Sequence, residues 1–467
     1  MTGALKEKCG VAAVVGHAEA AKVVYLALYA LQHRGQEAAG IAAWDGGALR
    51  VHSGLGLVAE VFSPEIAESL RGKVAIGHTR YATAGASSPA EAQPLRGMTR
   101  HGPLALGHNG NLVNALTLRR ELEGAGAVFH SSSDTEVILQ LLARSAEQDV
   151  ADALADALRR VRGAFSLVVL AGDRVIAARD PQGFRPLSLG RLPDGAAVVA
   201  SETCAFDLIG ARFERDIEAG EMVVLGPRPD QLASSFPAGV GLPAPCIFEY
   251  VYFSRPDSRV FGRDVADVRR ALGRELAREQ PAQADLVVPV PDSGVPAAIG
   301  YSRESGIPFD HGLTRNHYVG RTFIEPTASI RNFGVKIKLN PVRSLVAGRR
   351  LVLVDDSIVR GTTMKKIVQL LRQAGAREVH VRISAPPTVS PCFYGIDTPV
   401  EEELIASSNS VEEIRQAIGA DSLGYLSVEG MHRAAGAVPG EFCAACFTRR
   451  YPVEVVDRDE LADARRG

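Results

Sequence analysis

The spacing of apolar residues changes character part-way along the chain. In the first part, the apolar runs at 9–16 and 165–172 predict buried strands. Residues 136–145 and 150–161 repeat apolar positions at helical spacing, so helices are expected between the strands. Residues 226–246 are dense in Pro, Gly and Ser, which is typical of a linker.

Beyond this linker, strand, loop and helix follow one another in repeated units. An apolar strand at 285–290 precedes a polar turn and a helical pattern at 295–306. A second strand at 351–354 is followed by a polar segment and by a helical pattern at 364–375. Continuous apolar strands that lead into amphipathic helices are typical of a parallel sheet covered by helices on both faces. This part is therefore predicted to be an α/β domain.

The composition is that of a soluble protein with more than one domain. A chain of 467 residues predicts two to three domains, and 46% hydrophobic with 23% charged residues is an ordinary globular balance. The net charge of -2 gives no reason to expect a nucleic acid or an anionic membrane as partner. No apolar run approaches the roughly 20 residues of a membrane helix, and the N-terminal residues lack the apolar core of a secretory signal. Six cysteines are too few for a disulfide scaffold, so a cytoplasmic protein is expected.

The segment 351–363 carries the most specific motif of the chain. Its strand delivers Asp355 and Asp356 to the carboxyl end of a parallel sheet, where open α/β folds bind their ligands. Residues 360–363 then open a helix, with a glycine that lets the backbone approach a phosphate and with N–H and hydroxyl groups that can donate to it. The two carboxylates suit the hydroxyls of a ribose and a Mg²⁺ ion. An ordinary Asp-Asp turn with a helix cap is the alternative, and the order of strand, acids and Gly-Thr-Thr disfavours it.

These residues resemble the phosphoribosyl pyrophosphate (PRPP) motif of type I phosphoribosyltransferases. The resemblance implies that Asp355 and Asp356 hold the ribose hydroxyls and Mg²⁺, and that Ser293, in a Pro-Asp-Ser-Gly loop, stands at the metal-associated position. The segment 316–342 resembles the flexible loop that folds over PRPP in this family. The basic residues in and beside it that suit this anion are Arg315, Arg321, Arg331, Lys336 and Lys338, of which Arg321 and Lys338 are expected to bind it. The expected 5-phosphate site consists of Arg360, Gly361, Thr362 and Thr363.

Cys9 lies close to the start of the chain, where a cysteine can become an N-terminal nucleophile. If the leader 1–8 were removed, Cys9 would carry a free α-amino group with a pKa of about 8, which can act as base for the adjacent thiol. A small apolar cysteine in a strand is the alternative. Four segments that resemble the glutaminase domain of amidotransferases with an N-terminal cysteine nucleophile favour the catalytic interpretation. They are 33–42, 77–85, 107–114 and 131–137.

The matching segments contain side chains that suit glutamine hydrolysis. The guanidinium of Arg80 offers a bidentate fork for the α-carboxylate of glutamine. Asn109 and Gly110 offer a side-chain amide and a backbone N–H for a tetrahedral oxyanion. Asp134 is expected to pair with the ammonium group of the substrate. Arg34 is grouped with these glutamine-binding residues and is expected to position the surroundings of the nucleophile.

Four further cysteines leave several interpretations open. Only Cys443 and Cys446 form a C-x-x-C pair, whereas Cys246 and Cys392 lie far upstream. This spacing is compatible with structural Zn²⁺, with a [4Fe–4S] cluster and with simple buried thiols. Cys204 has no partner motif and is interpreted as a small buried residue.

The motifs of both halves occur together in one family. From Cys9 to about Cys446 the chain resembles the glutamine phosphoribosylpyrophosphate amidotransferases, which open purine biosynthesis. The resemblance implies a leader at 1–8 that is removed on maturation and an αββα N-terminal-nucleophile glutaminase domain at 9–235. It also implies a type I phosphoribosyltransferase domain, built on a parallel sheet, at 236–467.

The resemblance further implies the reaction and the cofactors. Cys9 would attack glutamine, and the released ammonia would pass internally to C1 of PRPP, giving 5-phosphoribosylamine and pyrophosphate. Mg²⁺ is implied for PRPP and a homotetramer for the assembly. A sugar-phosphate-aminating amidotransferase would explain only the first half, and a non-enzymatic PRPP sensor only the second. The iron–sulfur branch of the family implies one [4Fe–4S] cluster on Cys246, Cys392, Cys443 and Cys446.

Overall fold

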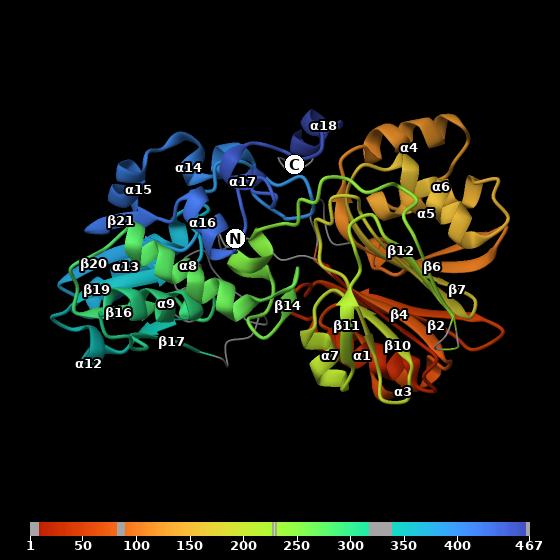
Figure 1. Ribbon diagram of the computed structural model, residues 1–467, viewed down its shortest axis with the longest axis horizontal. Coiled ribbons are helices and arrows are strands. Elements are labelled where there is room, and N and C mark those ends of the chain that lie inside the picture. The colour runs from red at the N-terminus through yellow and green to blue at the C-terminus, as the bar shows by residue number, and fades with distance from the viewer. Residues whose placement is uncertain (1–8, 82–88, 227, 229–230, 317–338, 464–467) are drawn as a thin grey trace, which may run out of the picture.

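The chain folds into two lobes that lie side by side (Figure 1), the first part in the red-to-yellow lobe and the rest in the green-to-blue lobe. The computed structural model describes residues 9–81, 89–226, 228, 231–316 and 339–463. No helix within these ranges is long and apolar enough to cross a membrane. The expected leader and four basic loop residues lie outside the described residues. These four are Arg321, Arg331, Lys336 and Lys338.

Two antiparallel sheets lie face to face in the first lobe. One has the strand order β11-β9-β10-β1-β4-β2-β3 and the other the order β13-β12-β8-β7-β6-β5. The strands of the first sheet are β1 (Gly10–Val15), β2 (Ala38–Trp44), β3 (Leu49–Leu55), β4 (Val74–Arg80), β9 (Ser188–Arg191), β10 (Ala197–Ala200) and β11 (Arg212–Asp216). Those of the second sheet are β5 (Leu95–Thr99), β6 (Gly102–Leu112), β7 (Gly163–Ala171), β8 (Arg174–Arg179), β12 (Met222–Leu225) and β13 (Leu232–Ser235).

Helices cover the outer face of each sheet, so the lobe has the four layers that were expected (Figure 1). The first sheet carries α1 (Ala20–Ala30) and α7 (Cys204–Ile209), and the second carries α4 (Ala115–Gly124), α5 (Asp134–Arg144) and α6 (Val150–Arg160). Shorter helices are α2 (Val58–Val61), α3 (Pro64–Ser69) and η1 (Pro89–Glu91). On β1, Val11 and Ala13 join the core between the sheets, whereas Ala12 and Val14 pack with α1. The whole run is apolar because both faces of the strand are buried.

A parallel sheet forms the centre of the second lobe, in the order β16-β19-β20-β21. Its strands are β16 (Leu286–Pro289), β19 (Arg350–Asp355), β20 (Glu378–Ile383) and β21 (Ser422–Tyr425). Around it lie α8 (Val265–Glu279), α9 (Val295–Ser305), α13 (Thr362–Gln373), α15 (Val411–Ile418) and α16 (Val428–Ala434). On β19, Val352 and Val354 pack on the side of α8 and α9, whereas Leu351 and Leu353 pack on the side of α13. The expectation of a parallel sheet with helices on both faces is confirmed.

Short elements connect and flank these layers. In the second lobe they are β14 (Arg259–Val260), β15 (Arg263–Asp264), β17 (Leu313–Arg315), β18 (Leu339–Pro341), α12 (Arg343–Val346), α14 (Ile405–Ser408), α17 (Ala445–Thr448) and α18 (Arg458–Asp463). One turn of π-helix, η2 (Glu249–Phe253), and one of 3-10 helix, η3 (Glu401–Glu403), complete the set for the described ranges.

Part of the predicted linker is a strand of the first lobe. β13 pairs antiparallel with β12 at the edge of the six-stranded sheet. Its four side chains are all exposed, so the strand leaves no apolar signal in the sequence. It forms because the backbone groups along β12 would otherwise lack partners.

The end of the described chain returns to the first lobe. α18 lies near α4 in Figure 1. The side chain of Asp457 accepts hydrogen bonds from the backbone N–H groups of Leu116 (2.8 Å) and Thr117 (3.3 Å) at the start of α4. These bonds satisfy donors that the first turn of a helix leaves unpaired. The last residues of the second lobe are therefore fastened to the first.

Candidate active sites in the two lobes

A cavity of about 340 Å³ opens in the first lobe where several predicted residues meet. Cys9 precedes β1, Arg80 ends β4, Gly110 lies on β6 and Asp134 begins α5. All four line the cavity, as does Leu461 of the returning C-terminal segment. Four segments that are distant in the sequence thus place a thiol, a guanidinium, a backbone N–H and a carboxylate around one space.

The thiol of Cys9 is held in its neutral form by its surroundings. Burial raises its pKa above the ordinary value of 9.0, while the backbone N–H of Tyr81 and the charge of Arg80 act in the opposite direction. A thiol with a raised pKa is almost entirely protonated near pH 7, so attack on a substrate requires a base. This need fits an α-amino group on Cys9 itself.

Arg80 and Asn109 each carry a buried donor that the protein leaves unpaired. One nitrogen of Arg80, Nη2, pairs with the carboxylate of Glu91, and Nη1 has no partner among the described residues. Nδ2 of Asn109, whose residue is 1% exposed, likewise lacks one. An unpaired buried donor costs about 1–3 kcal/mol, so both groups fit a ligand that brings oxygen acceptors.

Gly110 lies where no side chain could fit. A Cβ at this position would be 2.0 Å from the carbonyl oxygen of Ala164 on the neighbouring strand β7. The glycine therefore allows β6 and β7 to pair closely while Gly110 lines the cavity.

Asp134 is kept charged at the edge of the cavity. Burial acts to raise its pKa, but the charge of His108, 3.5 Å away, and the backbone N–H of Leu112 outweigh burial, and the pKa lies below its ordinary value. Leu112 donates to one carboxylate oxygen at 2.9 Å. A carboxylate ionised at neutral pH suits a substrate ammonium group.

The structure places Arg34 differently from the glutamine-binding role that was expected. It is 1% exposed and does not line the cavity. Its guanidinium binds the carboxylates of Glu202 and Glu249, and its Nε donates to the backbone carbonyl of Cys9 at 3.2 Å. These acceptors are all protein groups, and one of them is the backbone of Cys9. This agrees with the other half of the expectation.

A second cavity, of about 150 Å³, lies at the carboxyl end of the parallel sheet. Asp355 and Asp356 line it together with Ser293, Tyr252 and Gly361. Burial raises the pKa of both carboxyls, and for Asp355 the neighbouring charge of Asp356 raises it further. The hydroxyl of Ser293 hydrogen-bonds to Asp356 and acts against this shift. Two buried acids side by side fit a divalent cation or ribose hydroxyls, which would relieve their repulsion.

The expected phosphate site is the N-terminal turn of α13, but only part of it faces the cavity. Gly361 has a left-handed φ of 73°, and a Cβ there would be 2.8 Å from Cδ1 of Ile405. Gly361 and Thr363 line the cavity, whereas Thr362 and Arg360 do not. The guanidinium of Arg360 pairs with Glu403. The helix terminus itself, with its free N–H groups, is thus the part best placed for an anion.

The four cysteines whose role the spacing left open lie together in the second lobe. They are Cys246, Cys392, Cys443 and Cys446. All four are buried, and they are close enough to affect one another's charge: burial and then Cys246, Cys392 and Cys443 raise the pKa of Cys446 well above its ordinary value. The backbone N–H of Cys443 donates to Pro245, and that of Ile247 donates back to Cys443. Within the described ranges, no group of three or more His, Cys, Asp or Glu side chains is arranged to hold a single metal ion.

Cys204 matches its expected role as a small buried residue. It is 3% exposed and packs in the core beneath α1. Burial raises the pKa of its thiol, and the charge of Glu202 adds to the effect. Such a thiol is unreactive at neutral pH.

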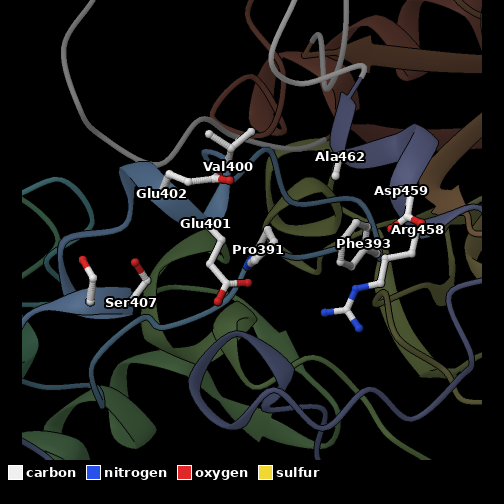
Figure 2. Close-up of a pocket in the computed structure, with 10 residues that line it drawn as sticks. Pro391, Phe393, Val400, Glu401, Glu402, Ser407, Arg458, Asp459 and Ala462 are labelled. Carbon is white, nitrogen blue, oxygen red and sulfur yellow. The ribbon is translucent and has the colours of Figure 1, made fainter.

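A third cavity, of about 520 Å³, is larger than the other two but contains none of the predicted site residues. It lies between α18 and the segment 391–402, and Figure 2 shows Glu401 and Arg458 on two sides of it. The guanidinium of Arg458 lies over the rings of Phe393 and Tyr451, at 5.8 and 5.3 Å from their centroids. Its lining mixes acids with one stacked base, so nothing in it indicates a reaction.

Comparisons with known proteins agree with the division into two sites. Residues 78–207 match the family described as a glutamine amidotransferase domain, and residues 263–386 match the phosphoribosyl transferase domain. Over 459 residues the chain is 50% identical to the amidophosphoribosyltransferase of Bacillus subtilis, which covers 97% of this chain and 95% of that protein. The chain belongs to the amidophosphoribosyltransferase family.

Other members of the amidophosphoribosyltransferase family and their structures agree. The chain is 51% identical over 453 residues to amidophosphoribosyltransferase 1 of Arabidopsis thaliana, a chloroplastic protein, with 96% of this chain and 79% of that protein covered. The structure of glutamine PRPP amidotransferase from B. subtilis complexed with ADP and GMP matches with a TM-score of 0.90 at 50% identity, covering 96% of this chain and 98% of that chain. A structure described as the allosteric regulatory enzyme of purine biosynthesis matches with a TM-score of 0.92 at 50% identity, covering 96% and 97%.

Several residues at these sites were not found by sequence reasoning. Glu91 pairs with Arg80, Tyr252 lines the second cavity, and Glu249 and Arg185 form buried ion pairs near Cys9 and the cysteines. Only Glu249 left a usable signal. It is a single acid within the apolar run 246–253, and a buried charge needs a partner.

Proposed function

We propose that the two cavities divide the two half-reactions of this amidophosphoribosyltransferase between them. As a member of that family, the protein hydrolyses glutamine and transfers the ammonia to C1 of PRPP, which gives 5-phosphoribosylamine and pyrophosphate in the first step of purine biosynthesis. The observation that carries the division is the placement of Cys9 in one cavity and of Asp355 and Asp356 in another, in separate lobes.

In the first cavity, Cys9 is the nucleophile of glutamine hydrolysis. Its α-amino group, once the leader 1–8 is removed, takes the thiol proton and later delivers a proton to the departing ammonia. Sulfur attacks the carboxamide carbon, and the oxyanion that forms accepts from Nδ2 of Asn109 and the N–H of Gly110. Water then hydrolyses the thioester. Arg80 and Asp134 hold the α-carboxylate and α-ammonium groups of the substrate.

In the second cavity, the residues bind and orient PRPP. The N-terminal turn of α13, with Gly361 and Thr363, receives the 5-phosphate, and Asp355 and Asp356 accept hydrogen bonds from the ribose hydroxyls. Asp355, Asp356 and Ser293 would hold Mg²⁺, which would supply positive charge to balance the pyrophosphate group. Ammonia replaces pyrophosphate at C1. Its internal passage between the lobes makes sense because ammonia that reached water would become ammonium, which is not a nucleophile.

The four clustered cysteines fit one [4Fe–4S] cluster. Each thiolate of such a cluster binds a different iron, so the sulfurs surround it without meeting at one point. The buried guanidinium of Arg185 is close enough to Cys246, Cys392 and Cys443 to interact electrostatically with their sulfurs. Its positive charge can therefore balance the negative charge of an anionic cluster. The backbone N–H of Tyr394 donates to the sulfur of Cys392 at 3.3 Å, a bond that an anionic sulfur favours.

The cellular setting and the assembly stay proposals. A cytoplasmic protein is supported by six cysteines that are all free of disulfides. A homotetramer is supported by exposed apolar side chains on neighbouring helices of the first lobe, where a subunit contact would cover them. These are Leu26 and Tyr29 on α1 and Leu208 on α7. Light scattering should then give four times the chain mass of 49.6 kDa.

Substitutions in the two cavities test the division. Cys9→Ser should abolish glutamine-dependent synthesis, because a hydroxyl is far less acidic than a thiol, and should keep synthesis from external ammonium salt at alkaline pH. Asp356→Asn should show the opposite pattern, with severe loss of synthesis from ammonia and nearly unchanged glutamine hydrolysis in the absence of PRPP. Pyrophosphate release and glutamate formation measure the two activities. Glutamine-dependent synthesis by Cys9→Ser would refute the assignment of the nucleophile.

A further inference from the structure

A buried ionic bridge crosses between the lobes beneath Cys9. The guanidinium of Arg34 binds both oxygens of the Glu249 carboxylate, at 3.0 Å from Nη1 and 2.8 Å from Nη2, and Nη1 also pairs with Glu202. Arg34 and Glu202 belong to the first lobe, whereas Glu249 opens η2 in the second. None of the three side chains is more than 1% exposed.

The other end of Arg34 reaches the nucleophile. Its Nε donates to the carbonyl oxygen of Cys9 at 3.2 Å. That carbonyl, the α-nitrogen and the Cβ that carries the thiol all branch from one Cα atom. Because the Cys9 carbonyl is held, the directions in which the thiol and the α-nitrogen leave the chain are limited. The strand β1, which follows at once, pairs with β4 and completes the support.

Further contacts from both lobes hold Glu249, since Ser254 belongs to the second lobe and Arg185, in the loop before β9, to the first. The hydroxyl of Ser254 donates to its Oε2 at 2.8 Å, and Nη1 of Arg185 lies 3.2 Å from Oε1. The buried side chain of Arg269 binds the backbone carbonyls of Tyr250 and Ser254 at 2.7 and 2.8 Å, which fixes the turn of η2. The carboxylate therefore has a defined position toward which the fork of Arg34 is aligned.

We propose that Glu249 is a positioning residue for glutamine hydrolysis, acting on Cys9 through Arg34, although it belongs to the transferase lobe. It does not line the glutaminase cavity. The same π-helix also carries Tyr252, which lines the PRPP cavity, so one short element contributes to both sites. The competing explanation is a purely structural one, in which Glu249 only neutralises two buried arginines. A buried ion pair by itself is weak evidence for either role.

The test is Glu249→Gln in the full-length protein, because glutamine keeps the size and one acceptor oxygen but removes the charge and the bidentate grip. We expect kcat of glutamine hydrolysis to fall about tenfold or more, since small displacements of a reacting group have effects of this size. KM for glutamine should change less than about twofold, because neither Glu249 nor Arg34 lines the glutaminase cavity. Alkylation of Cys9 by iodoacetamide should slow in parallel. Synthesis from ammonium salt and PRPP should persist.

A matched control separates positioning from the loss of a buried charge. Glu221→Gln removes a carboxylate that is 2% exposed, binds both terminal nitrogens of Arg215 at 2.8 Å and does not line the cavity of Cys9. Both variants should unfold at a lower temperature, and only Glu249→Gln should lose glutamine hydrolysis and thiol reactivity. Equal hydrolysis and equal alkylation rates in the two folded variants would overturn the proposal. So would loss of the ammonia reaction together with bound iron in Glu249→Gln alone.

If Glu249→Gln does not fold, Glu249→Asp provides the test instead. Aspartate keeps the charge but shortens the reach, so a positioning role predicts a fall in kcat of about threefold or more, with thiol alkylation slowed alike. Unchanged kcat would show that only the charge matters, which would overturn the proposal. The inference rests on Cys9 as nucleophile. The Cys9→Ser variant tests that assignment separately, so the two ideas can fail independently.

Discussion

At the scale of single residues, several buried polar groups of the first lobe lack a partner among the described residues. Nη1 of Arg80 and Nδ2 of Asn109 have no partner among the described residues, and both belong to the glutaminase motifs. Nδ1 of His78, which lies on β4 and is fully buried, also has no hydrogen-bond partner among the described residues. For His78 the consequence concerns stability, because its other nitrogen already lies 3.0 Å from the carbonyl oxygen of His108.

His78 should make the folded protein sensitive to acid. Burial lowers its pKa to about 3 from an ordinary 6.5. Between pH 6.5 and about 3 this histidine is protonated in the unfolded chain but neutral in the folded chain. Its contribution to the free energy of unfolding is therefore complete above pH 6.5 and is lost as pH falls toward 3. His78→Gln keeps a donor toward His108 and removes the titration. Between about pH 7 and about pH 5, the free energy of unfolding should fall by up to roughly 2 kcal/mol less in this variant than in the parent protein. The drop in Tm over the same range should be correspondingly smaller.

Thermal unfolding of a second histidine variant provides the comparison. The side chain of His130 is 83% exposed, so His130→Gln should show the same drop in Tm as the parent protein. If His78→Gln also showed that same drop, His78 would not be the buried neutral group that the structure indicates.

At the scale of elements, short irregular segments join the two lobes. Nδ2 of Asn111 on β6 donates to the carbonyl oxygen of Phe393 at 2.8 Å. Gly395 has a φ of 96°, and a Cβ there would be 2.8 Å from the carbonyl carbon of Gly110. The loop that carries Cys392 thus rests on the strand that carries the expected oxyanion donors. Loss of the cysteine cluster should therefore affect more than the second lobe.

Cys443→Ser should remove iron and stability together. Cys443 ties the segment of Cys246 to the C-terminal part through backbone hydrogen bonds, and metal binding by such segments is coupled to folding. Parent protein purified without oxygen should contain about four Fe and four sulfides per chain, and the variant should contain far less and unfold at a lower temperature. Cys204→Ser, which also changes a buried cysteine, should keep its iron. Stoichiometric zinc without iron in the parent would contradict the cluster.

At the scale of the whole molecule, the C-terminal segment closes over the glutaminase lobe. Asp457 binds the start of α4, and Leu461 lines the cavity of Cys9. The side chain of Glu460 pairs with Arg120 at the surface. The chain therefore passes from the first lobe to the second and back, and its last described helix completes the wall of the first site.

Asp457→Ala should weaken glutamine binding without harming the second site. It removes two backbone hydrogen bonds and one from the hydroxyl of Thr117, so α18 should leave the cavity more open. We expect KM for glutamine to rise about threefold or more, since a lost charge-assisted bond is worth about 1.5–3 kcal/mol, and synthesis from ammonium salt to stay unchanged. Glu460→Gln loses only an exposed ion pair and should behave like the parent. A similar KM in both variants would refute the role of the segment.

The parts of this protein that the sequence determined by itself are local. The order of strand, acids and glycine in 351–363 predicts both β19 and the turn into α13, since each step depends on neighbouring residues. The continuous apolar run of β1 likewise indicates burial on both faces. The motifs around Arg80, Asn109 and Asp134 correctly indicated residues that line the first cavity or lie beside it.

Only the tertiary structure decided which distant groups meet. Glu249 lies 215 residues from Arg34, and Phe393 lies 282 residues from Asn111, so no local spacing relates them. The exposed strand β13 has no apolar signal because its stability comes from backbone pairing with β12. Arg34 had a recognisable motif, but its role depends on partners in two lobes. Side-chain pattern predicts burial, whereas the partner of a buried charge is set by how the whole chain packs.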